Sequence, residues 1–220
     1  MMSEHERQSF ESTNVLIKQL TLEAGDERAG GLSFPKLFSV ALVIALLAAI
    51  AVVLATAGVR ADFNDYFWTW TSQFKVIGML LLAAGAVHAV WAAVTPGERP
   101  RLMQGVLPAG VFLLTGAILD RSNLPLFGAH SLSVVLCVGT IIAASLPAMV
   151  IILLAMRRGI PTRLTSSGVA AGLLAGSVGA LSYTIACLND GATFVATWYP
   201  VAIALVTLLG RAITPRALTW

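Results

Sequence analysis

The stretch LFSVALVIALLAAIAVVLATAG, residues 37–58, carries no charged side chain along its length. A helix needs roughly 20 apolar residues to cross the hydrocarbon core of a bilayer, and this run supplies them. The whole chain fits the same class, because 57% of its 220 residues are hydrophobic and 11% are charged, against about 25% charged in a soluble domain. The sequence therefore predicts an all-α membrane protein.

Five further segments are similarly long and apolar, so the expected fold is a bundle of six transmembrane helices. The bundle is expected over residues 37–220, after a polar segment over residues 1–36. That segment is rich in acids, so no cleavable signal peptide is expected at the start. Pro147 lies inside the fourth span and predicts a kink there. The expected spans are 37–58, 74–95, 103–119, 131–156, 165–188 and 193–212.

The Lys and Arg residues predict orientation, since the cytoplasmic loops of membrane proteins carry an excess of both. With the N-terminus inside, eleven of the fourteen basic residues fall on the cytoplasmic side, and only Arg60, Lys75 and Arg121 fall outside. Both termini are therefore expected in the cytoplasm. The aromatic residues that then lie toward the outer interface, as expected of anchoring side chains, are Phe63, Tyr66, Phe67, Trp68, Trp70, Trp198 and Tyr199.

Charged groups are missing from the middle of every expected span, where His88 is the one ionisable residue. Pathways for ions and substrates usually need such groups, so a small transporter or exporter, with only His88, Gln104 and Thr140 to line a path, is the weaker alternative. The sequence has no glycine-rich phosphate loop, paired acid motif or Ser/His/Asp arrangement, and we expect neither an enzyme nor a cofactor. A net charge of +3 is too small to argue for direct nucleic-acid binding.

Small residues recur every four positions in the fifth expected span, at Gly168, Gly172, Gly176 and Ala180. Residues at this spacing share one helical face, so they predict a groove where another helix backbone approaches closely. The groove fits a homodimer as readily as an internal contact. The short connection 157–163 predicts that the fourth and fifth spans are antiparallel neighbours.

Cys137 and Cys187 are the two cysteines, and both fall near the outer ends of their spans. Thiolates bind soft metals and are the oxidisable form of cysteine, so the pair is a candidate redox switch or transient soft-metal site. Cys187 lies about three helical turns after Gly176 and is expected on the same face, about 6 Å further out than Cys137. That offset allows a disulfide without implying one. Inert packing in a structural membrane subunit is the alternative. A structural zinc site is not expected, because four Cys or His ligands are usual and only His130 offers a third.

Residues 13–24 predict a short amphipathic helix in the cytoplasmic segment. Thr13 suits the N-cap position, and Leu16, Ile17 and Leu20 form one apolar side. A helix of this length is marginal alone in water. The segment therefore fits a helix ordered by a protein partner, or one that lies on the membrane.

The last third of the chain holds a series of specific motifs: MRRGIPTR at 156–163, AGLLAGSVGALSY at 171–183, Cys187, TWYP at 197–200 and the closing Trp220. With these motifs, the stretch from Met156 to Trp220 resembles the C-terminal half of the NrsF family, the six-span negative regulators of extracytoplasmic-function sigma factors. The spacing of Thr13, Leu16, Ile17 and Leu20 resembles the family's short N-terminal segment.

This resemblance implies an anti-sigma factor in the bacterial inner membrane. Such a protein holds an extracytoplasmic-function sigma factor inactive until heavy-metal or oxidative stress, from chromate, cadmium or an oxidant, releases it. The family's two functional cysteines carry over onto Cys137 and Cys187. Ala186 stands where the family often has a His, which favours direct thiol chemistry over a Cys/His metal site. The apolar side formed by Leu16, Ile17 and Leu20 is the expected sigma-binding surface, because sigma factors offer basic, helical surfaces to this acidic arm.

Overall fold

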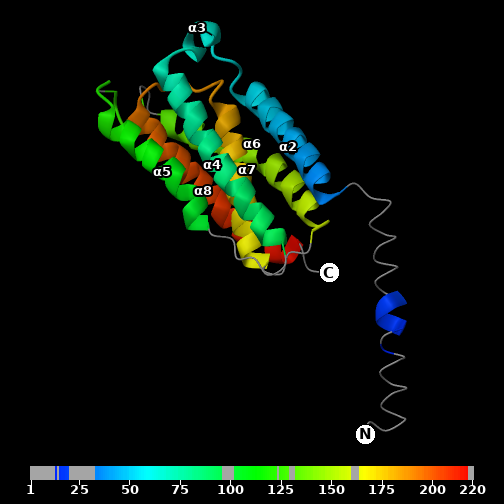
Figure 1. The fold of residues 1–220 in the computed structure, drawn as a ribbon. Coiled ribbons are helices and arrows are strands. Elements are labelled where there is room, and N and C mark those ends of the chain that lie inside the picture. Colours follow the sequence, from blue (N-terminus) through cyan, green and yellow to red (C-terminus); the bar gives the residue numbers. More distant parts are fainter. Residues whose placement is uncertain are drawn as a thin grey trace, which may run out of the picture. The chain divides into compact units, whose positions relative to one another are not determined.

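A computed structural model of the chain describes residues 13, 15–19, 33–95, 102–122, 124–128, 132–159 and 164–217. All regular elements in these ranges are helices, and six of them are long and apolar enough to cross a membrane, as the sequence predicted. The six are α2 (Phe34–Thr56), α4 (Trp70–Val94), α5 (Leu102–Leu119), α6 (Ser133–Met156), α7 (Leu164–Tyr183) and α8 (Ala192–Ala217), and the short α3 (Phe63–Phe67) joins α2 to α4 (Figure 1).

The chain divides into two units, Met1–Leu37 and Phe38–Trp220. In the first unit the described residues 13 and 15–19 are helical, and Leu16 and Ile17 are exposed. Leu20 and the acids of the N-terminal segment lie outside the described residues. In the second unit the connections between α2 and α4, α5 and α6, and α7 and α8 lie at one end (Figure 1). We call it the Cys187 end.

The most informative difference from the expected spans is at the end of α7. The helix was expected to reach residue 188 but ends at Tyr183. Residues 184–186 form a tight turn in which the amide of Ala186 donates to the carbonyl of Tyr183 at 3.0 Å. Cys187 therefore lies in the connection after α7, and the prediction that it extends the small-residue face of that helix is wrong.

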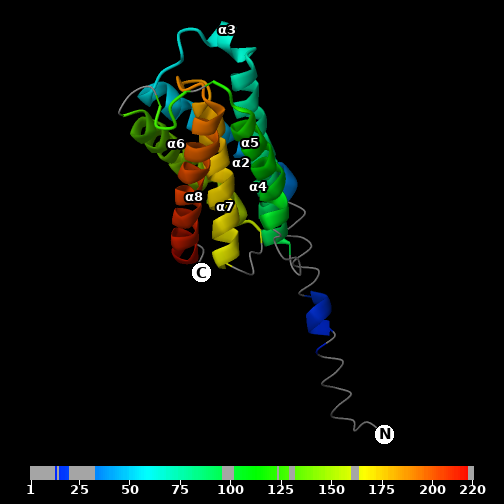
Figure 2. The ribbon, with the colours of Figure 1, turned by 90° about the vertical axis from the view of Figure 1, so that its left-hand side faces the viewer.

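α7 is the central helix of the second unit, with α4, α6 and α8 as its neighbours (Figure 2). Its sequence accounts for this position, because Gly, Ala and Ser make up most of the helix and nearly all of these residues are buried. Small side chains let neighbouring helices approach closely within a membrane, where tight packing replaces the hydrophobic driving force.

Glycine allows the close contact between α7 and α8. A Cβ atom added at Gly168 would lie 2.6 Å from the carbonyl oxygen of Gly210, and one at Gly172 would lie 2.8 Å from the Cα of Thr207. Gly176 faces Ile203 in the same way, and Ala180, one turn further on, is fully buried. Since α8 fills the groove beside these glycines, a second copy of the chain would have to bind elsewhere.

Replacing Gly172 with Ala should destabilise the bundle, because the new methyl group meets backbone atoms of α8 that cannot move aside cheaply. We expect a loss of about 1–3 kcal/mol, the usual range for overpacking, measured by reversible denaturation in detergent. Gly139→Ala in α6 is the matched control, because a Cβ there meets nothing within 4 Å. An equal effect of the two substitutions would contradict this account of the contact.

Candidate functional site

Both cysteines are fully buried at the Cys187 end, Cys137 in the second turn of α6 and Cys187 in the α7–α8 connection. Both are free thiols. They lie close enough to interact electrostatically with one another, and Tyr183 and Tyr199 lie near both. The two tyrosine ring centroids are 6.1 Å apart. The structure thus brings the two sequence-predicted thiols into one buried cluster.

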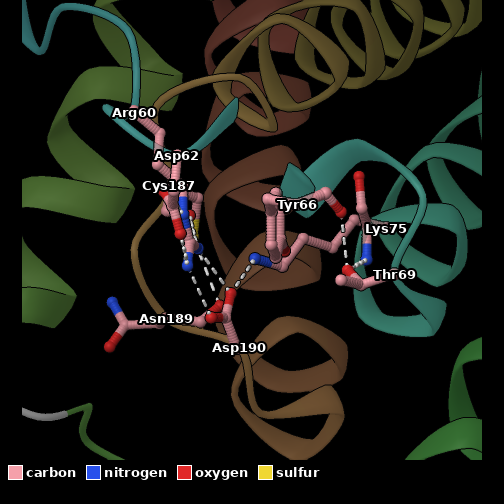
Figure 3. A network of polar contacts seen from close by, with 9 residues as sticks. Arg60, Asp62, Tyr66, Thr69, Lys75, Cys187, Asn189 and Asp190 are labelled. Carbon is pink, nitrogen blue, oxygen red and sulfur yellow. Dashed lines mark hydrogen bonds and ion pairs between the residues drawn. The ribbon is translucent and has the colours of Figure 1, made fainter. Parts of the chain in front are cut away.

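Arg60, just after α2, holds the segment that carries Cys187. Its guanidinium donates to the carboxylate of Asp190 at 2.8 and 3.0 Å and to the carbonyl of Cys187 at 3.2 Å (Figure 3). The remaining N–H groups donate to the carboxylate of Asp62. An arginine has five N–H donors, so all five are engaged here. Bidentate contacts between arginine and carboxylate are among the stronger hydrogen bonds in proteins.

Lys75 approaches the same carboxylate from α4. Its side chain is fully buried, and its Nζ lies 3.4 Å from Asp190 Oδ1. The ring of Tyr66 lies beside both cations, with its centroid 3.9 Å from Arg60 Cζ and 5.1 Å from Lys75 Nζ (Figure 3). A buried ammonium is costly unless it is paired. We call these four residues, Arg60, Tyr66, Lys75 and Asp190, the Asp190 clamp.

The charges of the clamp stabilise one another. Burial alone would raise the pKa of Asp190, but the hydrogen bonds from Arg60 and the charge of Lys75 outweigh it and hold that pKa below its ordinary value. Hydrogen bonds to Asp62 and Asp190 raise the pKa of Arg60. Burial raises the pKa of the Tyr66 hydroxyl, and the neighbouring carboxylate of Asp190 raises it further. With Asp62 included, two basic and two acidic side chains pair with one another.

A second set of contacts ties the α5–α6 connection to the start of α8. The carboxylate of Asp120 accepts hydrogen bonds from the amide of Thr193 at 2.9 Å and from its hydroxyl at 3.1 Å. Thr193 is the second residue of α8, so Asp120 caps a helix end whose amides would otherwise lack partners. The indole of Trp198 donates to the carbonyl of Leu126 at 2.9 Å. The α5–α6 connection is thus fixed to α8 at two points.

Sequence reasoning placed Arg60 and Lys75 only as outer charges and did not single out Asp190. A signal was present, since Asp190 is the one acid in the α7–α8 connection and stands three residues after Cys187. Two of the expected interface aromatics, Tyr66 and Tyr199, are buried rather than anchoring, whereas Trp68 and Trp70 are 81% and 73% exposed.

The polar residues that a transport path would need do not converge. His88 and Gln104 both lie on exposed helix surfaces. Within the described residues, no group of three or more His, Cys, Asp or Glu side chains is placed to hold a metal ion, and His130 lies outside those residues. The proposed sigma-binding residues Leu16 and Ile17 belong to the other unit of the chain.

Comparisons with known proteins give the relatives of this chain. The family model for the negative regulator of sigma F matches residues 22–220. A protein of Azospira oryzae named probable anti-sigma-F factor NrsF is 30% identical over 222 residues, covering 94% of this chain and 99% of the relative. No solved structure matches the chain. The stretch matched by the family model includes both thiols and the whole Asp190 clamp.

Asp120 should give the protein a pH-dependent component of stability. Burial tends to raise its pKa, but hydrogen bonds from Ser122 and Thr193 outweigh it and hold the pKa at about 2, below the ordinary 3.8. A lowered folded pKa stabilises the protein above the unfolded pKa, and this stabilisation is lost as the pH falls through the folded pKa.

We therefore expect Asp120→Ala to cost about 1 kcal/mol at neutral pH, as for a lost helix cap. The difference from the unmodified chain should shrink between pH 4 and pH 2. Denaturation in detergent across this range measures it, with Asp65→Asn as a control on an exposed acid. A difference that does not change with pH would contradict the assignment.

Proposed function

Because this chain belongs to the NrsF family of negative regulators of sigma F, we propose that it sequesters an extracytoplasmic-function sigma factor at the bacterial inner membrane. Heavy-metal or oxidative stress, sensed through Cys137 and Cys187, releases the sigma factor. The observation that carries the proposal is the family match itself, which spans both thiols and all six long helices.

The proposed topology places both termini in the cytoplasm and the Cys187 end toward the periplasm. Five basic residues at the opposite end of the six long helices support it, since cytoplasmic ends are rich in Lys and Arg. The exposed rings of Trp68 and Trp70 at the Cys187 end fit an outer membrane–water interface. The five basic residues are Lys36, Arg157, Arg158, Arg211 and Arg216.

The burial of both thiols supports the proposal that they sense stress. A soft metal cation binds thiolate sulfur and displaces the thiol proton, and an oxidant converts the thiolate to a larger, more polar group. Neither change fits the close packing around Cys137 and Cys187, both fully buried, so the helices and connections beside them must shift. A tenfold loss of sigma affinity needs only about 1.4 kcal/mol, which one altered contact between helices supplies.

The direct test is affinity purification of the tagged chain from gently solubilised membranes, with and without brief exposure to cadmium or dichromate. We expect a sigma factor to be present without stress and lost after it, identified by mass spectrometry. The Cys137→Ser/Cys187→Ser variant should retain the sigma factor in both conditions, because no thiolate is left to react.

Stress-induced release from the double variant would exclude the thiols as sensors while leaving sequestration intact. If no sigma factor is found in either sample from an intact bundle, the anti-sigma role itself is excluded. That result would leave a structural membrane subunit with inert cysteines, or a transporter, as the remaining functions.

The proposed sigma-binding surface is the apolar side of the N-terminal helix, formed by Leu16, Ile17 and Leu20. Leu16 and Ile17 are exposed in their own unit, and an exposed apolar helix side suits a groove on a protein partner. A helix of this length also gains order from a partner more readily than by itself.

Replacing Leu16 and Ile17 together with Asp should weaken sigma retention at least tenfold, since each buried apolar side chain contributes about 1.5–3 kcal/mol. Val15→Asp is the matched control, because Val15 is equally apolar and exposed but points to the opposite side of the helix. Co-purification of the sigma factor measures both. Equal loss in both variants, or no loss in either, would argue against this surface.

A further inference from the structure

We infer that Arg60, Lys75 and Asp190 are positioning residues for the Cys187 thiol: the Asp190 clamp keeps the 187–190 segment closed over that thiol, so opening of the clamp and modification of Cys187 promote each other. The inference deepens the proposed function and rests on it for the release of sigma. The gating of the thiol can be measured without any sigma factor.

The clamp holds both ends of a four-residue segment. One guanidinium, that of Arg60, binds the carbonyl of Cys187 and the carboxylate of Asp190. Between these two anchors the thiol of Cys187 points inward and lies 3.6 Å from the carbonyl oxygen of Asn189. Since Cys187 is fully buried, a reagent reaches its sulfur only after the segment has moved, and such movement breaks the Arg60 contacts.

Lys75 makes the closed position the favoured one. Its ammonium is fully buried, and within the described chain its one ion-pair partner is Asp190. Movement of Asp190 away from this site would leave a buried charge without its counter-charge, which is strongly unfavourable. The same carboxylate therefore pairs two cations that come from different parts of the chain, one after α2 and one on α4.

Arg60 also connects the segment to α2. The helix ends in a turn at Gly58, whose φ of +73° suits glycine, and two residues later the backbone amide of Arg60 donates to the carbonyl of Ile185 at 3.2 Å. Displacement of residues 185–190 therefore acts on the end of α2. That helix begins at Phe34, directly after the N-terminal segment in the chain.

Reciprocity makes the inference testable. If modification of Cys187 favours the open clamp, thermodynamic linkage requires that the open clamp favours modification of Cys187. A variant whose clamp is open more often should therefore expose this thiol more often and react faster. Arg60→Lys keeps the positive charge but loses the planar fork that binds two carboxylates at once. Asp190→Asn removes the carboxylate that pairs with Lys75 and one of the two that pair with Arg60. Either variant should open the segment more often while leaving the α7–α8 packing untouched.

The experiment measures the rate at which N-ethylmaleimide labels each thiol in native membranes, read by mass spectrometry. Cys137→Ser reports on Cys187 alone, and Cys187→Ser reports on Cys137. In Arg60→Lys and Asp190→Asn we expect Cys187 to react about tenfold faster, equivalent to a loss of about 1.4 kcal/mol, with the Cys137 rate unchanged. Asp65→Asn, an exposed acid outside the clamp, should change neither rate.

An unchanged Cys187 rate in both clamp variants would overturn the inference. An equal rise at both thiols would also overturn it, because it would mean general loosening of the bundle. The second readout is sigma retention without stress, which should fall in the clamp variants and not in Asp65→Asn. If the unmodified chain retains no sigma factor, the proposed function is excluded. The ratio of the two labelling rates would still decide whether the clamp controls access to Cys187.

Discussion

The Cys187 end depends on the pairing of one carboxylate, that of Asp190, with two cations in largely apolar surroundings. Charges are scarce in this chain, at 11% of residues, and a buried ammonium such as that of Lys75 persists only when a counter-charge is held beside it. Satisfying that requirement brings together the segment after α2, the start of α4 and the α7–α8 connection. The position of the Cys187 backbone follows from it.

The rest of the bundle is held by a different kind of contact. Along α7 the neighbouring helices approach through glycine and other small residues, as Gly168 and Gly172 do against α8. Such contacts act over short distances and tolerate little displacement, because packed interiors transmit strain rather than absorb it. Movement of the α7–α8 connection would therefore pass to its neighbours as a shift of whole elements. The polar clamp and the small-residue packing have complementary roles, one holding a segment and the other keeping helices rigid.

Much of the fold could be predicted from the sequence, because length and apolar composition alone identify membrane spans such as 37–58. Cys187 was misplaced because no Gly or Pro marks the end of α7, and the turn after Tyr183 is apolar except for Thr184. The clamp was missed for another reason. Arg60 and Asp190 are 130 residues apart, and their pairing arises from the packing of helices that one sequence does not specify. Tyr199 was expected at the interface because the sequence alone does not distinguish a buried aromatic residue from an interface anchor near the end of a span.

The free energies of the clamp contacts suit a switch. Hydrogen bonds to charged groups contribute about 1.5–3 kcal/mol each, and part of that is offset where Asp190 remains one-third exposed and reached by solvent. A clamp that contributes a few kcal/mol stays closed nearly all the time. A full set of protein ligands binds a structural zinc ion with a much larger free energy, roughly 10–16 kcal/mol. Two thiolates that supply only a fraction of that binding energy would therefore be enough to open the clamp. A buried thiol beneath such a clamp, as Cys187 is, is thus protected at rest and still able to respond, which neither an exposed thiol nor one deep in the glycine-packed core would be.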